Sequence, residues 1–163
     1  MKELMRIEGL KMYFGGLKAI DGLDLTINEG ETLGIIGPNG AGKTTLFNAI
    51  CGVYKPTDGK VIFKDSEVQG LPAHKMARMG IARTFQISKP LADLTILDNV
   101  IAAAGVHEYT GMSSYFRKSH TDEVVTKAKA VLEETGLSEL RDKKASDVSL
   151  GYLRRLEIAR VLV

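Results

Sequence analysis

The sequence lacks the features of a disulfide-bonded, membrane-spanning or nucleic-acid-binding protein. Its 163 residues hold one cysteine, Cys51, which excludes an internal disulfide and, on a predicted helix, indicates a small buried side chain. No apolar run approaches the roughly 20 residues that a bilayer-spanning helix needs, and Met1-Lys2-Glu3 is followed by no secretory apolar segment. The formal net charge is only +2, without a basic cluster, which argues against a nucleic-acid partner. These absences predict a chain that stays in the cytoplasm.

Length and composition are those of one ordinary globular domain, with 44% hydrophobic and 26% charged residues. Alternating and apolar runs predict a β-rich first part, and helical spacing of apolar residues predicts a helical region from residue 86 onward. The expected strands cover residues 4–10, 23–27, 33–36, 60–63 and 81–85. The expected helices cover residues 44–51, 73–79 and the apolar positions within 97–104 and 124–132. Residues 105–119 show no clear period and predict a loop or an irregular helix.

One motif identifies a ligand class, because it matches the phosphate-binding pattern G-x-x-x-x-G-K-[ST] at every fixed position. The motif reads Gly37-Pro38-Asn39-Gly40-Ala41-Gly42-Lys43-Thr44. Its three glycines give the backbone conformations closed to other residues, so that amides from about Gly40 to Thr45 converge on a β-phosphate. Lys43 is expected to reach the β- and γ-phosphates, and the Thr44 hydroxyl to bind Mg²⁺. A strand before the loop and a helix after it complete the predicted site for ATP or GTP.

A second motif leads to a family. Val148-Ser149-Leu150-Gly151-Tyr152, followed by the run Leu153–Arg160, resembles the signature L-S-G-G-Q and x-R-R-L-E-I-A-R of ABC-type ATPases. The resemblance extends along the chain, with Phe14-Gly15 before the phosphate loop and Arg83-Thr84-Phe85-Gln86 resembling the family's Q-loop. The segments R-T-F-Q, K-P-L and T-I-L-D-N-V are most similar to ATP-binding subunits of importers for branched-chain and other hydrophobic amino acids.

The resemblance implies roles for residues outside the phosphate loop. Phe14 would stack on adenine, with neighbouring Tyr13 as a possible substitute, and Gln86 would contact Mg²⁺ or the attacking water. The alternatives are that Phe14 is a core residue and that Gln86 is an ordinary solvated one. Ser149 and Gly151, at the start of a helix, would address the γ-phosphate bound by a partner subunit.

The signature segment departs from the family pattern at two positions. Leu150 stands where the pattern has its first glycine and could obstruct close approach to phosphate, and Tyr152 stands where it has glutamine. The alternative for this segment is that Ser149 only caps an amphipathic helix with Leu153, Leu156, Ala159 and Leu162 near one face.

The implied fold class is α/β, with a P-loop NTPase core of the ABC ATPase type that is incomplete at its C-terminus. It would comprise the core part with an antiparallel β subdomain and the P-loop (1–85), the Q-loop and an inserted α-helical subdomain (86–148), and the signature motif with its helix (149–163). In the family, a strand ending in Asp-Glu and a switch histidine follow the signature, and no residue of this chain can be given those catalytic roles. We therefore expect poor stability and weak or no ATPase activity from the 163 residues alone.

The resemblance implies an ATP-binding subunit of an ABC transporter that couples ATP binding and hydrolysis, with Mg²⁺, to uptake of branched-chain amino acids. Its partners would be a second ATPase subunit, identical or different, transmembrane permease subunits at the inner face of the cell membrane and, indirectly, a periplasmic or extracellular substrate-binding protein. The alternatives are a lipopolysaccharide-exporter ATPase, a soluble ABC ATPase acting in DNA repair or translation, and a P-loop kinase, which would need neither Gln86 nor the segment 149–160.

Overall fold

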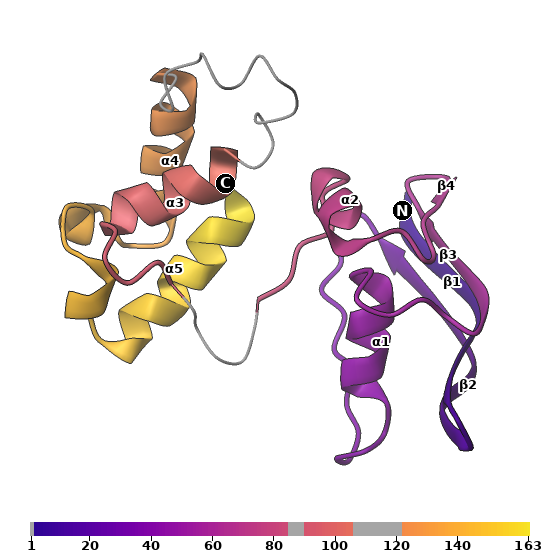
Figure 1. Cartoon of the computed structure of the whole chain (residues 1–163). Coiled ribbons are helices and arrows are strands. Elements are labelled where there is room, and N and C mark those ends of the chain that lie inside the picture. Colours follow the sequence, from indigo (N-terminus) through magenta and orange to yellow (C-terminus); the bar gives the residue numbers. More distant parts are fainter. Residues whose placement is uncertain (1, 85–89, 106–121) are drawn as a thin grey trace. The chain divides into compact units, whose positions relative to one another are not determined.

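The computed structural model describes residues 2–84, 90–105 and 122–163 (Figure 1). The chain forms two compact units, Met1–Ala82 and Arg83–Val163, which we call the N-terminal unit and the C-terminal unit.

The sheet of the N-terminal unit is built on a long hairpin. Strands β1 (Glu3–Phe14) and β2 (Leu17–Asn28) pair antiparallel across the turn at Gly15 and Gly16, and β3 (Asp58–Phe63) and β4 (Ser66–Glu67) extend the sheet in the order β2-β1-β3-β4. All three pairings are antiparallel. Short turns join β1 to β2 and β3 to β4, whereas β1 and β3 pair across the segment that holds β2 and α1. The first two strands are longer than their alternating sequence patterns predicted.

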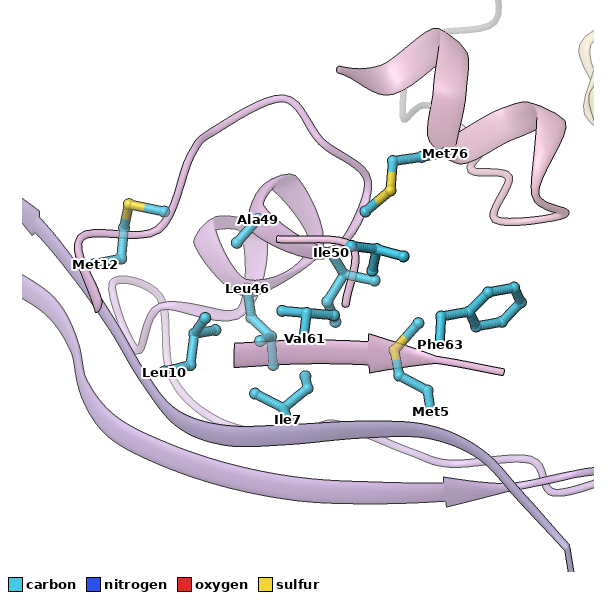
Figure 2. Close-up of a cluster of buried hydrophobic side chains, with 11 residues drawn as sticks. Met5, Ile7, Leu10, Met12, Leu46, Ala49, Ile50, Val61, Phe63 and Met76 are labelled. Atoms are coloured by element: carbon cyan, nitrogen blue, oxygen red, sulfur yellow. The ribbon is translucent and has the colours of Figure 1, made fainter. Parts of the chain in front are cut away.

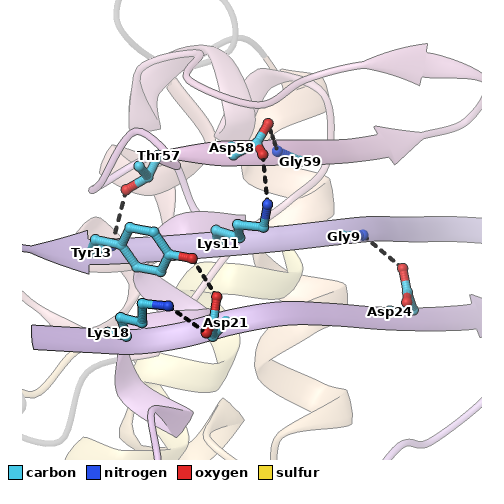
Figure 3. Close-up of polar contacts among 9 residues, drawn as sticks. All are labelled: Gly9, Lys11, Tyr13, Lys18, Asp21, Asp24, Thr57, Asp58 and Gly59. Carbon is cyan, nitrogen blue, oxygen red and sulfur yellow. Dashed lines mark hydrogen bonds and ion pairs between the residues drawn. The ribbon is translucent and has the colours of Figure 1, made fainter.

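A β-bulge in β1 keeps its apolar side chains on one face of the sheet. Met5 and Ile7 are buried, as are Leu10 and Met12, so the buried positions change from odd to even numbers between residues 7 and 10. Gly9 lies at this register shift with a left-handed φ of +54°, and its N–H donates to Asp24 Oδ1 at 2.6 Å (Figure 3). Without the extra residue of the bulge, strict alternation would place Leu10 and Met12 on the face opposite to Met5 and Ile7; with it, all four lie on the buried face.

Helix α1 (Lys43–Ile50) covers the apolar face of this sheet. Leu46, Ala49 and Ile50 lie in one buried cluster with residues of β1 and β3, as Figure 2 shows. A short second helix, α2 (Ala73–Arg78), contributes Met76, which is fully buried. The cluster consists of Met5, Ile7, Leu10, Met12, Leu46, Ala49, Ile50, Val61, Phe63, Val68 and Met76.

The C-terminal unit is helical. Its helices are α3 (Ile96–Gly105), α4 (Asp122–Glu134) and α5 (Leu150–Leu162), with 3₁₀ turns at Ser138–Leu140 and Ala145–Asp147. Their apolar faces form a second buried cluster, to which α3 contributes Ile96, Val100, Ile101 and Ala104. This arrangement confirms the helical spacing that the sequence showed around residues 97–104 and 124–132. Within the described residues, no helix is both long and apolar enough to cross a membrane.

A buried asparagine organises the start of α3. The side chain of Asn99 is fully buried. Its Oδ1 accepts the N–H of Leu91 at 2.8 Å, and its Nδ2 donates to the carbonyls of Leu91 at 3.0 Å and Thr95 at 2.9 Å. Thr95 Oγ1 in turn accepts the N–H of Asp98 at 3.0 Å, which satisfies a donor in the first turn of the helix. The segment before α3 is therefore fixed by side-chain hydrogen bonds.

Two strand predictions are wrong. Residues 33–36 form no strand, and neither do residues 81–84, the described part of the second predicted strand. A strand needs a neighbour for its N–H and C=O groups, and the strands of the described sheet pair only with one another. Ile36 is consequently 98% exposed and Leu33 39% exposed, so apolar surface before the phosphate loop is uncovered within the described residues.

One prediction of burial is also wrong. Cys51, directly after the end of α1, is only half-buried. In the alternative interpretation of the last helix, Leu162 lies near the same face as Leu156 and Ala159; these two are buried, whereas Leu162, at the end of α5, is 52% exposed. The predicted loop or irregular helix over residues 105–119 falls, apart from Gly105, outside the described residues.

Candidate nucleotide-binding site

The phosphate loop runs over residues 37–42 and leads directly into α1. Gly40 and Gly42 adopt left-handed φ values of +85° and +83°, which an L side chain disfavours. Gly37 differs from expectation, since its φ is not left-handed. A Cβ there would instead lie 3.2 Å from Ala41 Cβ. Glycine is therefore favoured at residue 37 because a side chain would crowd Ala41, and not because of the backbone conformation.

Gly42 also brings the loop against β2. A Cβ on Gly42 would lie 2.6 Å from the carbonyl oxygen of Ala19 and 3.4 Å from Ile20 Cγ1. Real Cβ atoms do not approach a backbone oxygen that closely, so only glycine permits this contact. The C-terminal end of the loop therefore rests directly on the hairpin.

Lys43 lies across the loop. Its Nζ donates to the carbonyl oxygen of Gly37 at 2.5 Å and to that of Pro38 at 2.7 Å. The ammonium group is thereby held beside the loop backbone, at the N-terminus of α1. A bound phosphate oxygen can replace these carbonyls as an acceptor, because the flexible lysine stem carries three donors in a compact head.

The first turn of α1 adds the conditions for binding an anion. Its N–H groups have no partner within the helix, and the helix dipole places partial positive charge at that end. The first turn contains no acidic residue that would oppose an anion. Thr44 is exposed and Thr45 half-buried, so the Thr44 hydroxyl is accessible and would serve as a ligand for a metal ion.

Metal ligands beyond Thr44 are few in the described part of the chain. No group of three or more His, Cys, Asp or Glu side chains gathers there in a way that could hold an ion. Gln86, the other expected Mg²⁺ contact, lies outside the described residues. The residues present fit a magnesium ion that is bound mainly by phosphate oxygens and water, with one hydroxyl from the protein.

Phe14 ends β1 with 44% of its surface exposed, which argues against the alternative of a core residue. Its ring packs against Tyr54, with centroids 5.4 Å apart and planes at 75°. This edge-to-face geometry covers at most one face of the Phe14 ring. The hairpin register places Phe14 opposite Leu17, two residues before Ala19, and therefore close along β2 to the contact with the phosphate loop.

Tyr13, the possible substitute for Phe14, contacts Asp21 and Lys18 of β2. Its hydroxyl donates to Asp21, and Lys18 Nζ lies 5.3 Å from the centre of its ring (Figure 3). The hydrogen bond to Asp21 raises the pKa of Tyr13, and the same bond, together with Lys18, lowers the pKa of Asp21. The residue available for a nucleotide base is Phe14.

A second polar group ties β1 to β3 beside this end of the hairpin (Figure 3). Lys11 Nζ donates to Asp58 Oδ2 at 3.0 Å, and the N–H of Gly59 donates to Asp58 Oδ1 at 2.9 Å. The hydrogen bond from Lys11 is the main reason why the pKa of Asp58 lies below its ordinary value, with the Gly59 N–H next. Charge on both side chains therefore supports the pairing of the two strands.

The signature segment begins α5 in the C-terminal unit. Ser149 occupies the N-cap position and is exposed, but its hydroxyl makes no capping hydrogen bond, so capping does not occupy it. Gly151 is exposed, and so is Leu150, at 61%. Tyr152 lies against Arg155, whose Cζ is 5.6 Å from the ring centre. Leu150 thus projects its side chain beside the two residues expected to meet phosphate.

The structure adds residues that motif reading did not single out. Ala19 carries the carbonyl on which Gly42 rests, and Tyr54 packs against Phe14. Neither belongs to a spaced pattern, because Ala19 acts through its backbone and Tyr54 stands in a turn after α1.

Comparisons with known proteins show the family of this chain. The profile of the family described as ABC transporter matches residues 20–163. The chain is 40% identical to the high-affinity branched-chain amino acid transport ATP-binding protein LivG of Escherichia coli K12, over 98% of this chain and 65% of LivG. It is 39% identical to BraF of Pseudomonas aeruginosa, a protein of the same description, over 99% of this chain and 66% of BraF. The chain thus spans 65% of the length of LivG.

Solved structures show the same fold. The ADP conformation of MJ1267, an ATP-binding cassette of an ABC transporter, matches with a TM-score of 0.86 at 37% identity, covering 99% of this chain and 65% of that one. A dimeric post-hydrolysis state of the cassette MJ0796 bound to ADP and Pi matches with a TM-score of 0.75 at 25% identity, covering 98% and 69%. These matches confirm the predicted α/β fold of the P-loop type. With a family match over residues 20–163 and 40% identity to LivG over 98% of its length, the chain belongs to the ABC transporter family of ATP-binding proteins.

Proposed function

We propose that this chain is the ATP-binding part of an ABC transporter subunit that drives uptake of branched-chain amino acids. The observation that carries the ATP-binding part is the phosphate loop, with Gly40 and Gly42 in left-handed conformations and Lys43 held over the loop at the start of α1. The substrate class rests on the similarity to LivG and BraF, both described as branched-chain amino acid transport ATP-binding proteins.

Each described residue of the site has a role in this proposal. Lys43 releases the loop carbonyls and pairs with the β- and γ-phosphates, while the amides from Gly40 to Thr45 bind the β-phosphate. Phe14 stacks on the adenine ring. The Thr44 hydroxyl would hold Mg²⁺, together with Gln86 from outside the described residues, and the ion would neutralise charge on the phosphates.

Hydrolysis and transport belong to a larger assembly in this proposal. Ser149 and Gly151 at the start of α5 would face the γ-phosphate on a second ATPase subunit, identical or different, so that ATP joins the two. The helical region from about Gln86 to Leu140 would dock on permease subunits at the inner face of the cell membrane. A substrate-binding protein outside that membrane would deliver the amino acid, and nucleic acid would have no part. No observation favours the exporter, the soluble ATPase or the kinase.

Binding of Mg²⁺-ATP to the 163-residue chain tests the site. Lys43→Ala is expected to weaken binding by about 10- to 100-fold, since hydrogen bonds to charged groups contribute about 1.5–3 kcal/mol. Lys75→Ala is the matched control, because Lys75 is an exposed lysine of α2 in the same unit. Equal binding by wild type and Lys43→Ala, or no binding by a folded wild type, would contradict the proposal.

A chimera tests the transport function separately. Residues of LivG that match this chain are replaced by residues 1–163, and leucine uptake is measured in cells that lack LivG. We expect uptake by the chimera and none by its Lys43→Ala variant. The purified 163-residue chain, assayed by itself with Mg²⁺-ATP, is expected to show no appreciable ATPase activity. A folded, ATP-hydrolysing chimera that supports no uptake would refute the proposed substrate class or its coupling.

A further inference from the structure

Tyr54 stands out because it contacts the proposed base-stacking residue and has no role so far. It lies four residues after the end of α1, is 40% exposed, and packs edge-to-face against Phe14 at 5.4 Å. Both rings are partly exposed, so this contact lies at the surface and not in the buried cluster of the N-terminal unit.

The segment that carries Tyr54 is fixed at both ends. On the α1 side, the N–H groups of Val53 and Tyr54 donate to the carbonyl of Asn48 at 2.8 and 3.2 Å. On the sheet side, the N–H of Thr57 donates to the Lys11 carbonyl at 2.9 Å, and Thr57 Oγ1 accepts the N–H of Tyr13 at 2.9 Å (Figure 3). The backbone around Tyr54 is thus tied to the helix that follows the phosphate loop and to the strand that ends in Phe14.

Phe14 alone is less constrained. It is the last residue of β1, next to the glycine turn, and its cross-strand neighbour Leu17 is 65% exposed. A phenylalanine ring at such a position can rotate between staggered χ1 rotamers, and stacking on a base requires one of them. An edge-to-face partner held by a fixed backbone selects one ring orientation and leaves at least one face open.

We propose that Tyr54 is a positioning residue of the nucleotide site, which holds the Phe14 ring in the orientation that stacks on the base. This inference rests on the proposed function, because it requires Phe14 to contact the base. It makes recognition of the base depend on the turn after α1, and it leaves recognition of the phosphates to the loop.

The test separates the base from the phosphates. Affinity for ATP and for inorganic tripolyphosphate, which has no base, is measured for the 163-residue chain with Tyr54→Ala, Phe14→Ala and the double variant. Tyr54→Phe keeps the ring and should bind as wild type. Val53→Ala, at the exposed neighbouring position, is the matched control. An unfolding midpoint for each variant shows that the unit is intact.

We expect Tyr54→Ala to weaken ATP binding by about two- to tenfold, the range of one aromatic pair, and to leave tripolyphosphate binding unchanged. In the Phe14→Ala background, Tyr54→Ala should have no further effect, because the ring it positions is gone. Unchanged ATP affinity in Tyr54→Ala, with Phe14→Ala weakened, would overturn this inference alone. So would an equal loss for tripolyphosphate. Unchanged affinity in Phe14→Ala, or a folded wild type that binds neither ligand, would instead refute the proposed site.

Discussion

The contact between Gly42 and β2 gives a prediction with a built-in control. Gly42→Ala forces a Cβ into a residue with φ +83° and to 2.6 Å from the Ala19 carbonyl oxygen. Gly40→Ala imposes the same backbone strain, at φ +85°, but its Cβ would meet nothing within 4 Å. The two variants therefore differ mainly in the clash with the hairpin.

The magnitudes follow from these two terms. A left-handed conformation costs an L residue about 1–2 kcal/mol, which is the expected loss of stability for Gly40→Ala. An overpacked contact adds about 1–3 kcal/mol, so Gly42→Ala should lose about 2–5 kcal/mol. Gly16→Ala, with neither a left-handed φ nor a neighbour within 4 Å, should change stability by less than about 0.5 kcal/mol.

Urea unfolding followed by circular dichroism gives the free energy of unfolding for the three variants. Hydrogen exchange of peptides from β2 and α1 assigns the change to the N-terminal unit, because these elements meet at the phosphate loop. Equal losses in Gly42→Ala and Gly40→Ala would refute the contact with Ala19. Losses below about 0.5 kcal/mol in both would refute the left-handed conformations as well.

Three further predictions concern stability. Asn99→Ala should destabilise the C-terminal unit by about 1–3 kcal/mol in urea unfolding, because it removes the acceptor of the Leu91 N–H and the side-chain donor to the Leu91 and Thr95 carbonyls; a loss below about 0.5 kcal/mol would contradict this. Leu156→Ala, at a fully buried position, should lower the free energy of unfolding by about 2–5 kcal/mol. Leu162→Ala, at 52% exposure, should lower it by less than about 0.5 kcal/mol. Similar losses in the two variants would contradict the burial of Leu156 and the exposure of Leu162. The lowered pKa of Asp58 beside Lys11 contributes stability that is present above the unfolded pKa of about 3.9 and lost as pH falls through the folded pKa. Thermal unfolding of Asp58→Asn between about pH 5 and pH 2 should therefore depend less on pH than that of the wild type, and parallel curves would rule this contribution out.

The sequence predicted the parts of the fold that local pattern determines. Strands at residues 4–10 and 23–27 and the helix after the phosphate loop were confirmed, because alternation and motif context suffice for them. The position of the β-bulge could not be derived, since a glycine within a strand does not say which neighbour pairs with it. Gly9 and Asp24, fifteen residues apart, define the bulge only through the hairpin register.

The apolar run 33–36 shows where pattern fails. Its composition favours a strand, but a strand exists only beside another strand, and that neighbour is not encoded in four residues. The candidate site likewise combines residues that local sequence predicts with residues that only tertiary contacts bring to it. The phosphate-loop residues were found from spacing alone, whereas Tyr54 and the Ala19 carbonyl entered the site through tertiary contacts that have no sequence signal.

The phosphate loop is held mainly by contacts on its C-terminal side. On its N-terminal side the loop follows residues 33–36, which pair with no described strand; Ile36 is 98% exposed, and the packing of Ile35 against the buried cluster is a contact that holds this segment. On its C-terminal side it continues into α1, whose Leu46, Ala49 and Ile50 are packed on the sheet, and Gly42 rests on Ala19. The amides expected to bind phosphate, from Gly40 to Thr45, all belong to this second side. Loop geometry in the described residues therefore depends on the helix and the hairpin, so nucleotide binding should respond to changes at Gly42 more than to changes at Ile36.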